Sequence, residues 1–345
     1  MHTTKPVETC PYCEGHKVIR KGKRKNKYGD IQLYYCHHCR RRFSPLVNKN
    51  RTYPLRVIIE ALSLYNHHNS YQQTADFIAK KFGIKISRQI VRLWVSDYEE
   101  YLLFKSLRER AAKIMEPYRW ISETRLLHGL VYSYKYHRAK AELIVRGSKR
   151  YKDFEQLQDY LEGVPLSCPH TLFREQRPRA STQRHCFQLD GVKITPRHEN
   201  TAVQYARFVL QTVANNKRRH ETVQDFLLVN DSATIAVEVP VILRAEDLKW
   251  FAEQGYDIPL TLDPDGLMTG HIDIVQIRFG MIHILDYKPG ARREKPIEQL
   301  MIYALALSRL TGIDLYHFKC AWFDDQDYFE FYPRAVVKKT RTVAA

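Results

Sequence analysis

The stretch GHIDIVQIRFGMIHILDYK, residues 270–288, restricts the fold more than any other part of the chain. Its two runs of β-branched and apolar residues predict two buried strands, which a turn at Phe279-Gly280 joins. Asp273 lies in the first strand, and Asp286 follows thirteen positions later in the second. Because side chains alternate between the faces of a strand, Asp286 and Lys288 point to the same face. Two carboxylates and an ammonium group at one strand pair predict a site for Mg²⁺ or Mn²⁺ and a phosphodiester.

Further polar residues accompany this strand pair. From about residue 190 the apolar periodicity predicts a helix over 197–213, a strand over 235–243 that carries Glu238, the strand pair, and a helix over 298–310. Gln299 and Tyr303 are four residues apart in the last helix and therefore share a face. A cross-strand ion pair on a half-exposed sheet would explain Asp286 and Lys288 alone. It does not explain the additional polar groups, whose burial is unfavourable unless a metal or a substrate satisfies them.

The order of these elements resembles the PD-(D/E)xK nuclease superfamily, and specifically its RecB-like branch, over residues 190–333. The motifs that carry the resemblance are Gly270-His271-Ile272-Asp273, Asp286-Tyr287-Lys288 and Gln299-x-x-x-Tyr303. The resemblance implies that Asp273 and Asp286 bind the metal and that Lys288 is the catalytic lysine. It also implies that Gln299 and Tyr303 position DNA or support the lysine.

The same family places an acidic residue or a histidine on the first helix of the fold, and here several residues compete for this role. Glu199, the preferred carboxylate, and His198, a further ligand for Mg²⁺ or Mn²⁺, begin the helix expected over 197–213. Glu238 is either a third catalytic carboxylate or a charge at a strand edge. Some RecB-like relatives hold an iron–sulfur cluster through one cysteine before the core and three after it. Only Cys320 follows the core here, so we expect no Fe–S cluster.

Four of the seven cysteines form two CxxC pairs that 22 residues separate. The four are Cys10, Cys13, Cys36 and Cys39. Two thiolate pairs can close a tetrahedral Zn²⁺ site, and such a site folds a segment that is too small to be stable through burial. With a strand predicted over 31–35, the pattern indicates a structural zinc ribbon in residues 1–50. The remaining cysteines are expected to be buried, inert thiols.

Residues 51–104 predict three helices. Pro54 begins the first, Ser70 and Gln73 form a capping box for the second, Gly83 ends it, and Ser87 caps the third. A helix, a tight turn with glycine and a second helix are typical of a helix-turn-helix module, whose last helix lies in the major groove. The alternative is a generic three-helix bundle. The residues expected to face DNA bases are Arg88, Gln89 and Arg92.

The charge distribution indicates a polyanionic partner. The formal net charge is +17, and residues 1–50 alone carry twelve Lys and Arg against three Asp and Glu. Such a basic segment is typical of phosphate binding. The run YYCHHCRRRFSPL, which contains Arg40, Arg41 and Arg42, and the helices after it resemble the zinc ribbon and helix-turn-helix of insertion-sequence transposases over residues 8–100. The resemblance implies recognition of double-stranded DNA, although the RNase H-like catalytic domain of those transposases is not evident after residue 105.

These patterns predict a multidomain chain with five parts. They are a small zinc ribbon (1–50), an all-α helix-turn-helix domain (51–104), a basic α/β linker or accessory domain (105–190), an α/β restriction-endonuclease-like core with a mixed sheet flanked by helices (191–335), and a basic tail (336–345). We expect a Mg²⁺- or Mn²⁺-dependent DNA endonuclease that the N-terminal modules bring to duplex DNA. The alternative is a non-catalytic DNA-binding regulator derived from a transposase.

The biological setting is less constrained by the residues. A role in mobile-element movement and a role in host defence both fit the two resemblances. Cutting both strands at one place normally requires two active sites, which favours a homodimer. The chain has no run of 18 apolar residues and no basic-then-apolar N-terminus, so we expect no membrane association and a cytoplasmic, nucleoid-associated protein.

Overall fold

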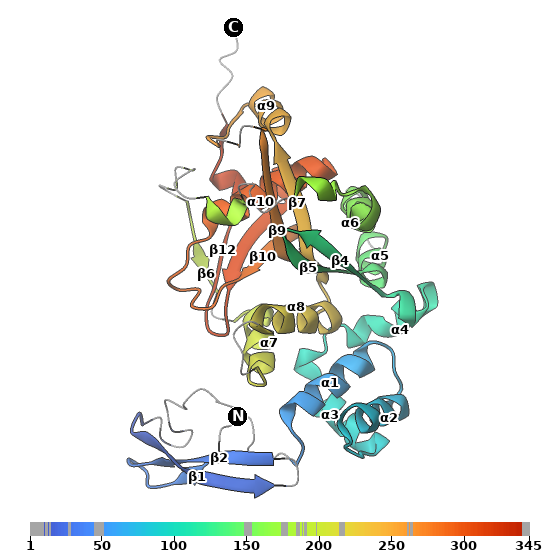
Figure 1. Cartoon of the computed structure of the whole chain (residues 1–345), viewed down its shortest axis with the longest axis vertical. Coiled ribbons are helices and arrows are strands. Elements are labelled where there is room, and N and C mark those ends of the chain that lie inside the picture. The colour runs from blue at the N-terminus through green and yellow to red at the C-terminus, as the bar shows by residue number, and fades with distance from the viewer. Residues whose placement is uncertain are drawn as a thin grey trace. The chain divides into compact units, whose positions relative to one another are not determined.

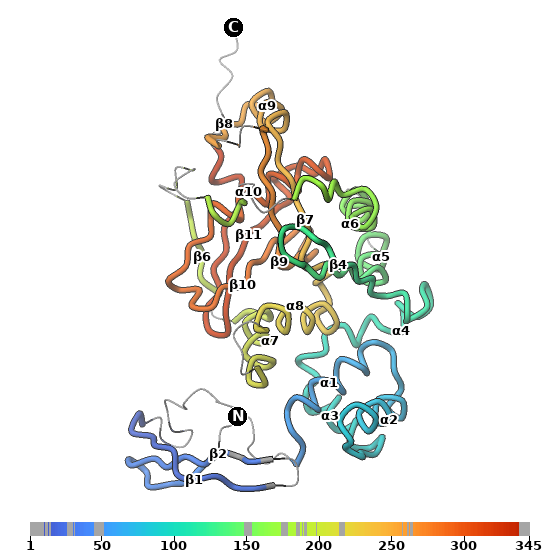
Figure 2. The backbone as a smooth tube through the Cα atoms, in the orientation of Figure 1, coloured from blue at the N-terminus to red at the C-terminus, as the bar shows by residue number. Residues whose placement is uncertain are grey.

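The computed structural model describes residues 10, 13, 15–26, 29–44, 52–147, 154–173, 179–183, 187, 189, 192–197, 199–213, 218–260, 262 and 265–339. The chain divides into two compact units, residues 1–102 with 208–219, and residues 103–207 with 220–345. Figures 1 and 2 trace the elements from the N-terminus in blue to the C-terminus in red. Within the described ranges, no helix combines the length and the apolar character that crossing a membrane requires.

The first unit contains a small antiparallel sheet in the order β1-β2-β3 (Figure 1). Its strands are β1 (Val18–Asn26), β2 (Gly29–Cys36) and β3 (Arg42–Phe43). The strand expected over 31–35 is confirmed as part of β2. Tyr34 and Phe43 stack with their ring centroids 5.8 Å apart, and among the described residues Cys10 and Cys36 are the further buried members of this core. A core of this size is too small to stabilise a sheet by burial alone.

Three helices follow the sheet, as the sequence predicts. They are α1 (Leu55–Asn66), α2 (Tyr71–Phe82) and α3 (Arg88–Asp97). The Ser70 hydroxyl accepts from the backbone N–H of Gln73, and the Gln73 side chain accepts from that of Ser70, which confirms the capping box. Gly83 ends α2 in the left-handed conformation with φ 66°, where a glycine is unstrained. Ser87 caps α3.

The second unit is a mixed α/β domain with an eight-stranded mixed sheet and flanking helices. The sheet order is β4-β5-β7-β9-β10-β11-β12-β6, and only the β10–β11 pair is parallel. The strands are β4 (Ile121–His128), β5 (Leu130–His137), β6 (Thr195–Pro196), β7 (Thr234–Arg244), β9 (Leu267–Arg278), β10 (Met281–Tyr287), β11 (Phe318–Phe323) and β12 (Tyr328–Phe331). Residues 105–190, expected as a linker or accessory domain, therefore contribute β4 and β5 to the same sheet as β7, β9 and β10.

Helices and short turns complete the second unit. The α-helices are α4 (Lys105–Ile114), α5 (Arg138–Val145), α6 (Glu155–Ser167), α7 (Thr201–Leu210), α8 (Arg219–Asn230), α9 (Ala245–Glu253) and α10 (Ile297–Thr311). The 3₁₀ turns are η2 (Glu99–Tyr101) in the first unit and η3 (Pro117–Arg119), η5 (His170–Leu172), η6 (Ala180–Thr182), η8 (Leu315–His317) and η9 (Pro333–Ala335) in the second. Strands β8 (Tyr256–Asp257) and β13 (Lys338–Lys339) pair separately, and residues 340–345 of the expected basic tail lie outside the described residues. α10 packs along β7, β9, β10 and β11 and is buried over most of its length.

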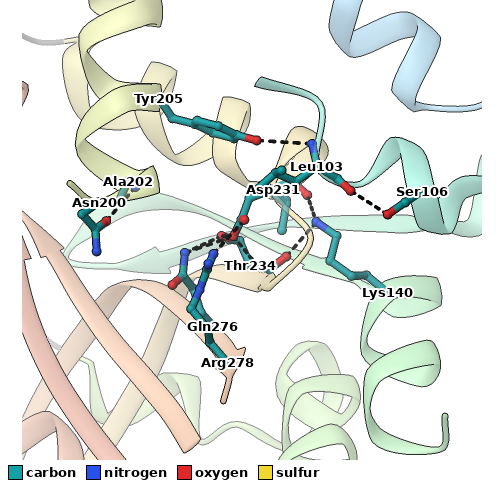
Figure 3. A network of polar contacts seen from close by, with 11 residues as sticks. Leu103, Ser106, Lys140, Asn200, Ala202, Tyr205, Asp231, Thr234, Gln276 and Arg278 are labelled. Atoms are coloured by element: carbon teal, nitrogen blue, oxygen red, sulfur yellow. Dashed lines mark hydrogen bonds and ion pairs between the residues drawn. The ribbon is translucent and has the colours of Figure 1, made fainter. Parts of the chain in front are cut away.

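A buried polar network attaches the C-terminal end of α8 to the sheet (Figure 3). Asp231, directly after α8, accepts from the backbone N–H and the hydroxyl of Thr234 at 2.9 and 2.7 Å and forms an ion pair with Arg278 at 2.8 Å. Gln276 donates to both Asp231 and Thr234. Lys140 of α5 is fully buried and donates to two backbone carbonyls, one of them that of Thr234 at 2.9 Å. The network fixes α8 relative to β7 and β9, and therefore the position of the residues at its other end.

Candidate active site

Three carboxylates come from three neighbouring strands of the second unit. Glu238 lies in β7, Asp273 in β9 and Asp286 near the end of β10. In the β7–β9 ladder Val237 pairs with Ile274 and Val239 with Ile272, so Glu238 lies opposite Asp273 between these two pairs. β7 lies between β5 and β9 in the sheet order, but its pairing with β5 covers Ala236 and Val237 and ends before Glu238. Both expected roles of Glu238, a third carboxylate or a charge at a strand edge, therefore stay predictions. The sheet therefore gathers three acidic side chains that are 35 and 13 residues apart in the sequence.

Asp273 and Asp286 are oriented by the end of the strand pair and by α10. The backbone N–H of Tyr287 donates to Asp273 Oδ2 at 3.0 Å. Lys288 Nζ donates to Asp286 Oδ1 at 3.2 Å and lies 2.9 Å from Oδ2, while Gln299 Nε2 donates to Oδ1 at 3.2 Å. The contact of Lys288 with Oδ2 lacks hydrogen-bond geometry. Within the described part of the chain, this buried oxygen accepts no hydrogen bond.

Tyr303 connects two of the sequence motifs through a close packing contact. Its hydroxyl accepts from Gln299 Nε2 at 3.0 Å, and its ring is 3% exposed. A Cβ atom on Gly270 would lie only 2.4 Å from Cε1 of this ring. The Tyr303 ring in α10 therefore leaves room only for a glycine at position 270 of β9. Gln299 donates hydrogen bonds to both the Tyr303 hydroxyl and the Asp286 carboxylate, so the packing of the ring also positions Asp286.

α8 is the helix that meets the carboxylates, and the sequence-based prediction did not contain it. His220 Nδ1 lies 3.5 Å from Asp273 Oδ2, and its ring packs edge-on against Tyr287. Gln224, one turn later, donates to Glu238 Oε1 at 2.7 Å and to the Asp273 carbonyl at 3.3 Å. A histidine and a glutamine four residues apart, ahead of the apolar run FLLV, are the sequence signal that indicates this pair.

Glu238 has an unusual backbone conformation for a residue in the middle of a strand. Its φ is +53°, in the left-handed region that side chains other than glycine adopt at a cost of about 1–3 kcal/mol. Strain of this kind persists only where the surrounding structure imposes it, and it concentrates at functional sites. The conformation directs the Glu238 carboxylate towards Gln224 of α8.

The charges of the site are not balanced by the protein's own cations. Burial and, next, the charge of Asp273 raise the pKa of Asp286 to about 7 and that of Glu238 to about 8. Burial disfavours the charged form of Lys288, but Asp286 and Asp273 raise its pKa. In the same way, burial opposes charge on His220 while Asp273 raises its pKa. Both bases favour their charged forms, and two of the carboxylates still hold protons more tightly than usual.

These residues fit a divalent cation of the Mg²⁺ or Mn²⁺ type. Such hard ions prefer carboxylate oxygens, and the site offers three carboxylates. Asp286 Oδ2 is a buried oxygen that forms an ion pair with Lys288 at 2.9 Å, so a bound cation would share this oxygen with the lysine. Asp273 and Asp286 are the side chains that would hold the ion, with His220 next to Asp273. Among the described residues, the ligand atoms of all three carboxylates do not lie within 4.8 Å of one another, so Glu238 would approach the ion only after a small rearrangement.

Two further residues were predicted for this site, and only Glu199 lies among the described residues. Glu199 is exposed ahead of α7, and among the described residues it makes no hydrogen bond or ion pair with the three carboxylates. His198 lies outside the described residues. The helix expected over 197–213 exists as α7, but α8 presents its polar residues to Asp273 and Glu238.

The residues predicted to bind DNA or zinc are in the first unit. Cys10 Sγ lies 3.5 Å from Cys39 Sγ and Cys13 Sγ 3.6 Å from Cys36 Sγ, and all four sulfurs lie within 4.8 Å of one another. The four cysteines can hold a structural zinc ion. The arginines and the glutamine predicted to contact DNA are exposed on the ribbon and on the first turns of α3; they are Arg40, Arg41, Arg42, Arg88, Gln89 and Arg92.

Comparison with known proteins adds no relative. A scan of protein-family models and searches of curated proteins and of solved structures found no match to this chain.

Proposed function

We propose that this chain is a divalent-metal-dependent DNA endonuclease whose second unit is a restriction-endonuclease-like core of the RecB-like kind. The observation that carries the proposal is the convergence of Glu238, Asp273 and Asp286 with Lys288 in one partly buried site. A Mg²⁺ or Mn²⁺ ion bound there would supply Lewis-acid stabilisation of the phosphoryl oxygens. In-line attack of water on a phosphodiester is the reaction that this donor set supports.

The protein's own residues would orient the reacting groups. Lys288 favours its charged form next to Asp286, so it donates hydrogen bonds to the attacked phosphate or to the incoming water. Gln299 and Tyr303 fix the Asp286 carboxylate, and the Tyr287 backbone N–H fixes Asp273. His220 and Gln224 hold the remaining sides of Asp273 and Glu238. Each carboxylate thus has at least one partner that limits its rotation before the substrate arrives.

The first unit supports DNA as the substrate. Its helices α2 and α3 and the glycine-ended turn between them have the order of a helix-turn-helix module, and α3 exposes Arg88, Gln89 and Arg92. We propose that the four ribbon cysteines bind zinc and that Arg40, Arg41 and Arg42 contact phosphates. Recognition of duplex DNA, a mobile-element or defence role, and homodimer formation for cutting both strands are parts of this proposal.

Cleavage of plasmid and duplex oligonucleotides in Mg²⁺ or Mn²⁺ tests the proposal. We expect cleavage by the native chain that EDTA abolishes and that Asp286→Asn and Lys288→Met each reduce by about 100-fold or more. Lys319→Met is the matched control, because Lys319 of β11 is likewise a largely buried lysine that pairs with a carboxylate, Glu330, at 3.1 Å. Native protein without metal-dependent cleavage, or equal cleavage by all variants, would leave the non-catalytic DNA-binding regulator as the better explanation.

A further inference from the structure

A second cluster of metal-ligating side chains lies in the second unit, on residues that the candidate active site does not use. His128 ends β4, Cys168 follows the last residue of α6, and His170 begins η5. One ligand atom from each of the three residues lies within 4.8 Å of the other two. His128 and Cys168 are buried, and His170 is half-buried.

The backbone between Cys168 and His170 brings both side chains to this place. Pro169 has φ −75° and ψ 74°, and the His170 N–H donates to the Cys168 carbonyl at 2.8 Å. These values define an inverse γ-turn with proline at its centre. Because the proline ring fixes φ, the turn is preorganised, and it keeps the thiol and the imidazole on the two sides of one tight bend.

His128 is held from both of its ring nitrogens. Nε2 lies 2.9 Å from His170 Nδ1, and Nδ1 lies 2.8 Å from Nε2 of His271 in β9. His271 stacks on Tyr132 with centroids 3.6 Å apart, and Phe173 stacks on His128 at 3.9 Å. A histidine that binds a metal normally has its other ring nitrogen held by a partner and its surroundings closed to water, and His271 with these aromatic rings provides both.

We propose that His128 Nε2, His170 Nδ1 and the Cys168 thiolate bind a second zinc ion, with His271 holding the His128 ring in place. A thiolate with two imidazoles is a ligand set that zinc prefers over Mg²⁺ or Ca²⁺. A tetrahedral ion with Zn–N bonds of about 2.0–2.1 Å separates two nitrogen ligands by about 3.3–3.4 Å, so the observed 2.9 Å requires only a small opening. The fourth ligand position is left for water or another donor.

A chain of hydrogen-bonded neutral imidazoles without metal is the competing explanation. It explains the two nitrogen–nitrogen contacts, but it gives no role to Cys168, whose sulfur joins the same cluster. The zinc explanation accounts for all three residues and for the turn at Pro169. The ion would tie β4 to the end of α6 and, through His271, would brace β9 two residues before Asp273.

Zinc content of the full-length chain tests this site separately from the ribbon. We expect about two zinc ions per native chain, about one in Cys168→Ala, and about one in the ribbon variant Cys36→Ser. Combining the two substitutions should leave almost none. Cys320→Ala is the matched control, because Cys320 is a buried thiol of the same unit whose Sγ donates to the Leu300 carbonyl and belongs to no group of metal-ligating side chains among the described residues, and it should keep about two ions.

A second variant covers the case in which Cys168→Ala does not fold. His170→Asn changes a half-buried ligand and should also hold about one ion per chain. In cobalt-loaded Cys36→Ser protein we expect a sulfur-to-cobalt absorption band that disappears in Cys36→Ser/Cys168→Ala. A native chain whose single zinc ion is lost in Cys36→Ser, or a zinc content that neither Cys168→Ala nor His170→Asn lowers, overturns the proposal. A single ion that is lost only with Cys168 or His170 supports it and argues against zinc in the ribbon.

Discussion

Replacing Gly270 by alanine should destabilise the second unit by about 1–3 kcal/mol, which is the usual cost of inserting a methyl group into a packed core. Gly270 has no left-handed φ, so the backbone itself accepts alanine. The cost arises because the new Cβ would lie 2.4 Å from Cε1, 3.2 Å from Cδ1 and 3.3 Å from Cζ of Tyr303. The ring cannot yield cheaply, since it is 3% exposed and its hydroxyl is bonded to Gln299.

The sign of this effect should reverse when the ring is removed. Tyr303→Ala alone should cost about 3–5 kcal/mol through the cavity that it leaves. In that background Gly270→Ala should be neutral or stabilising by about 0.4–1 kcal/mol, because the methyl group has room and alanine restricts the unfolded chain. The coupling free energy between the two positions is therefore about 1–4 kcal/mol.

Urea unfolding in a Trp94→Phe background measures the coupling. Trp94 is the single tryptophan of α3 in the first unit, so the remaining fluorescence comes from Trp120, Trp250 and Trp322 of the second unit. The four proteins of the cycle are compared at one temperature and salt concentration. Equal effects of Gly270→Ala with and without the tyrosine ring would refute the packing argument and with it the physical link between the GHxD and QxxxY motifs.

Three further predictions concern single residues. Burial lowers the pKa of Lys140 from 10.5 to about 7, so the unfolded chain binds more protons between these values. The free energy of unfolding of the native chain, measured with urea relative to Lys140→Met, should consequently rise by about 1.4 kcal/mol per pH unit from pH 7.5 to 10. A difference between the two proteins that does not change with pH would contradict a buried neutral amine. His220→Ala should reduce Mn²⁺-dependent cleavage by about 10–100-fold, while Glu199→Ala leaves it unchanged. The reverse pattern would show that Glu199, rather than His220, is the residue from the first helix of the fold that takes part in the site. Arg92→Ala should weaken the binding of duplex DNA by about 1–3 kcal/mol, measured by fluorescence anisotropy at fixed salt. Lys81→Ala, which changes an exposed α2 lysine paired with Glu60, should have little effect. Equal losses of binding free energy in the two variants would indicate general charge attraction.

The sequence patterns predicted correctly the elements that are stabilised by interactions between residues close together in the chain. The capping residues Ser70 and Ser87 lie at the expected helix starts, because a cap acts only on the backbone groups next to it. The turn at Phe279-Gly280 is confirmed, with φ of 53° and 78°, values that a two-residue hairpin turn requires at both positions. α10 was predicted within a residue at each end, since its long apolar run leaves little choice.

The elements that were not predicted from the sequence depend on contacts between residues far apart in the chain. α8 buries Val223, Phe226, Leu227 and Leu228 in succession, so no single apolar stripe with helical period marks it, and His220 was missed with it. β5 joins the sheet through Lys135 and Tyr136, which pair with residues about a hundred positions later. Such pairings follow from the complete fold rather than from local propensity.

The register between β7 and β9 likewise determines which residue lies opposite Glu238. A register shift between Thr234 and Ala236 precedes the point where Glu238 comes to lie opposite Asp273. Without that extra residue every later side chain of β7 would change face. A sequence pattern of alternating residues cannot place a bulge, which is why Glu238 stayed ambiguous between a ligand and an edge charge.

The electrostatics of the site argue against a purely structural ion pair between Asp286 and Lys288. A structural pair needs one carboxylate for one ammonium group, but here burial and, next, the charge of Asp273 raise the pKa of Asp286 to about 7 and that of Glu238 to about 8. The Glu238 backbone adds a left-handed φ that costs about 1–3 kcal/mol. Replacing such groups by apolar residues would stabilise a fold that used them only for packing. These features support the proposal that a divalent cation binds at Asp273 and Asp286, with Glu238 close by.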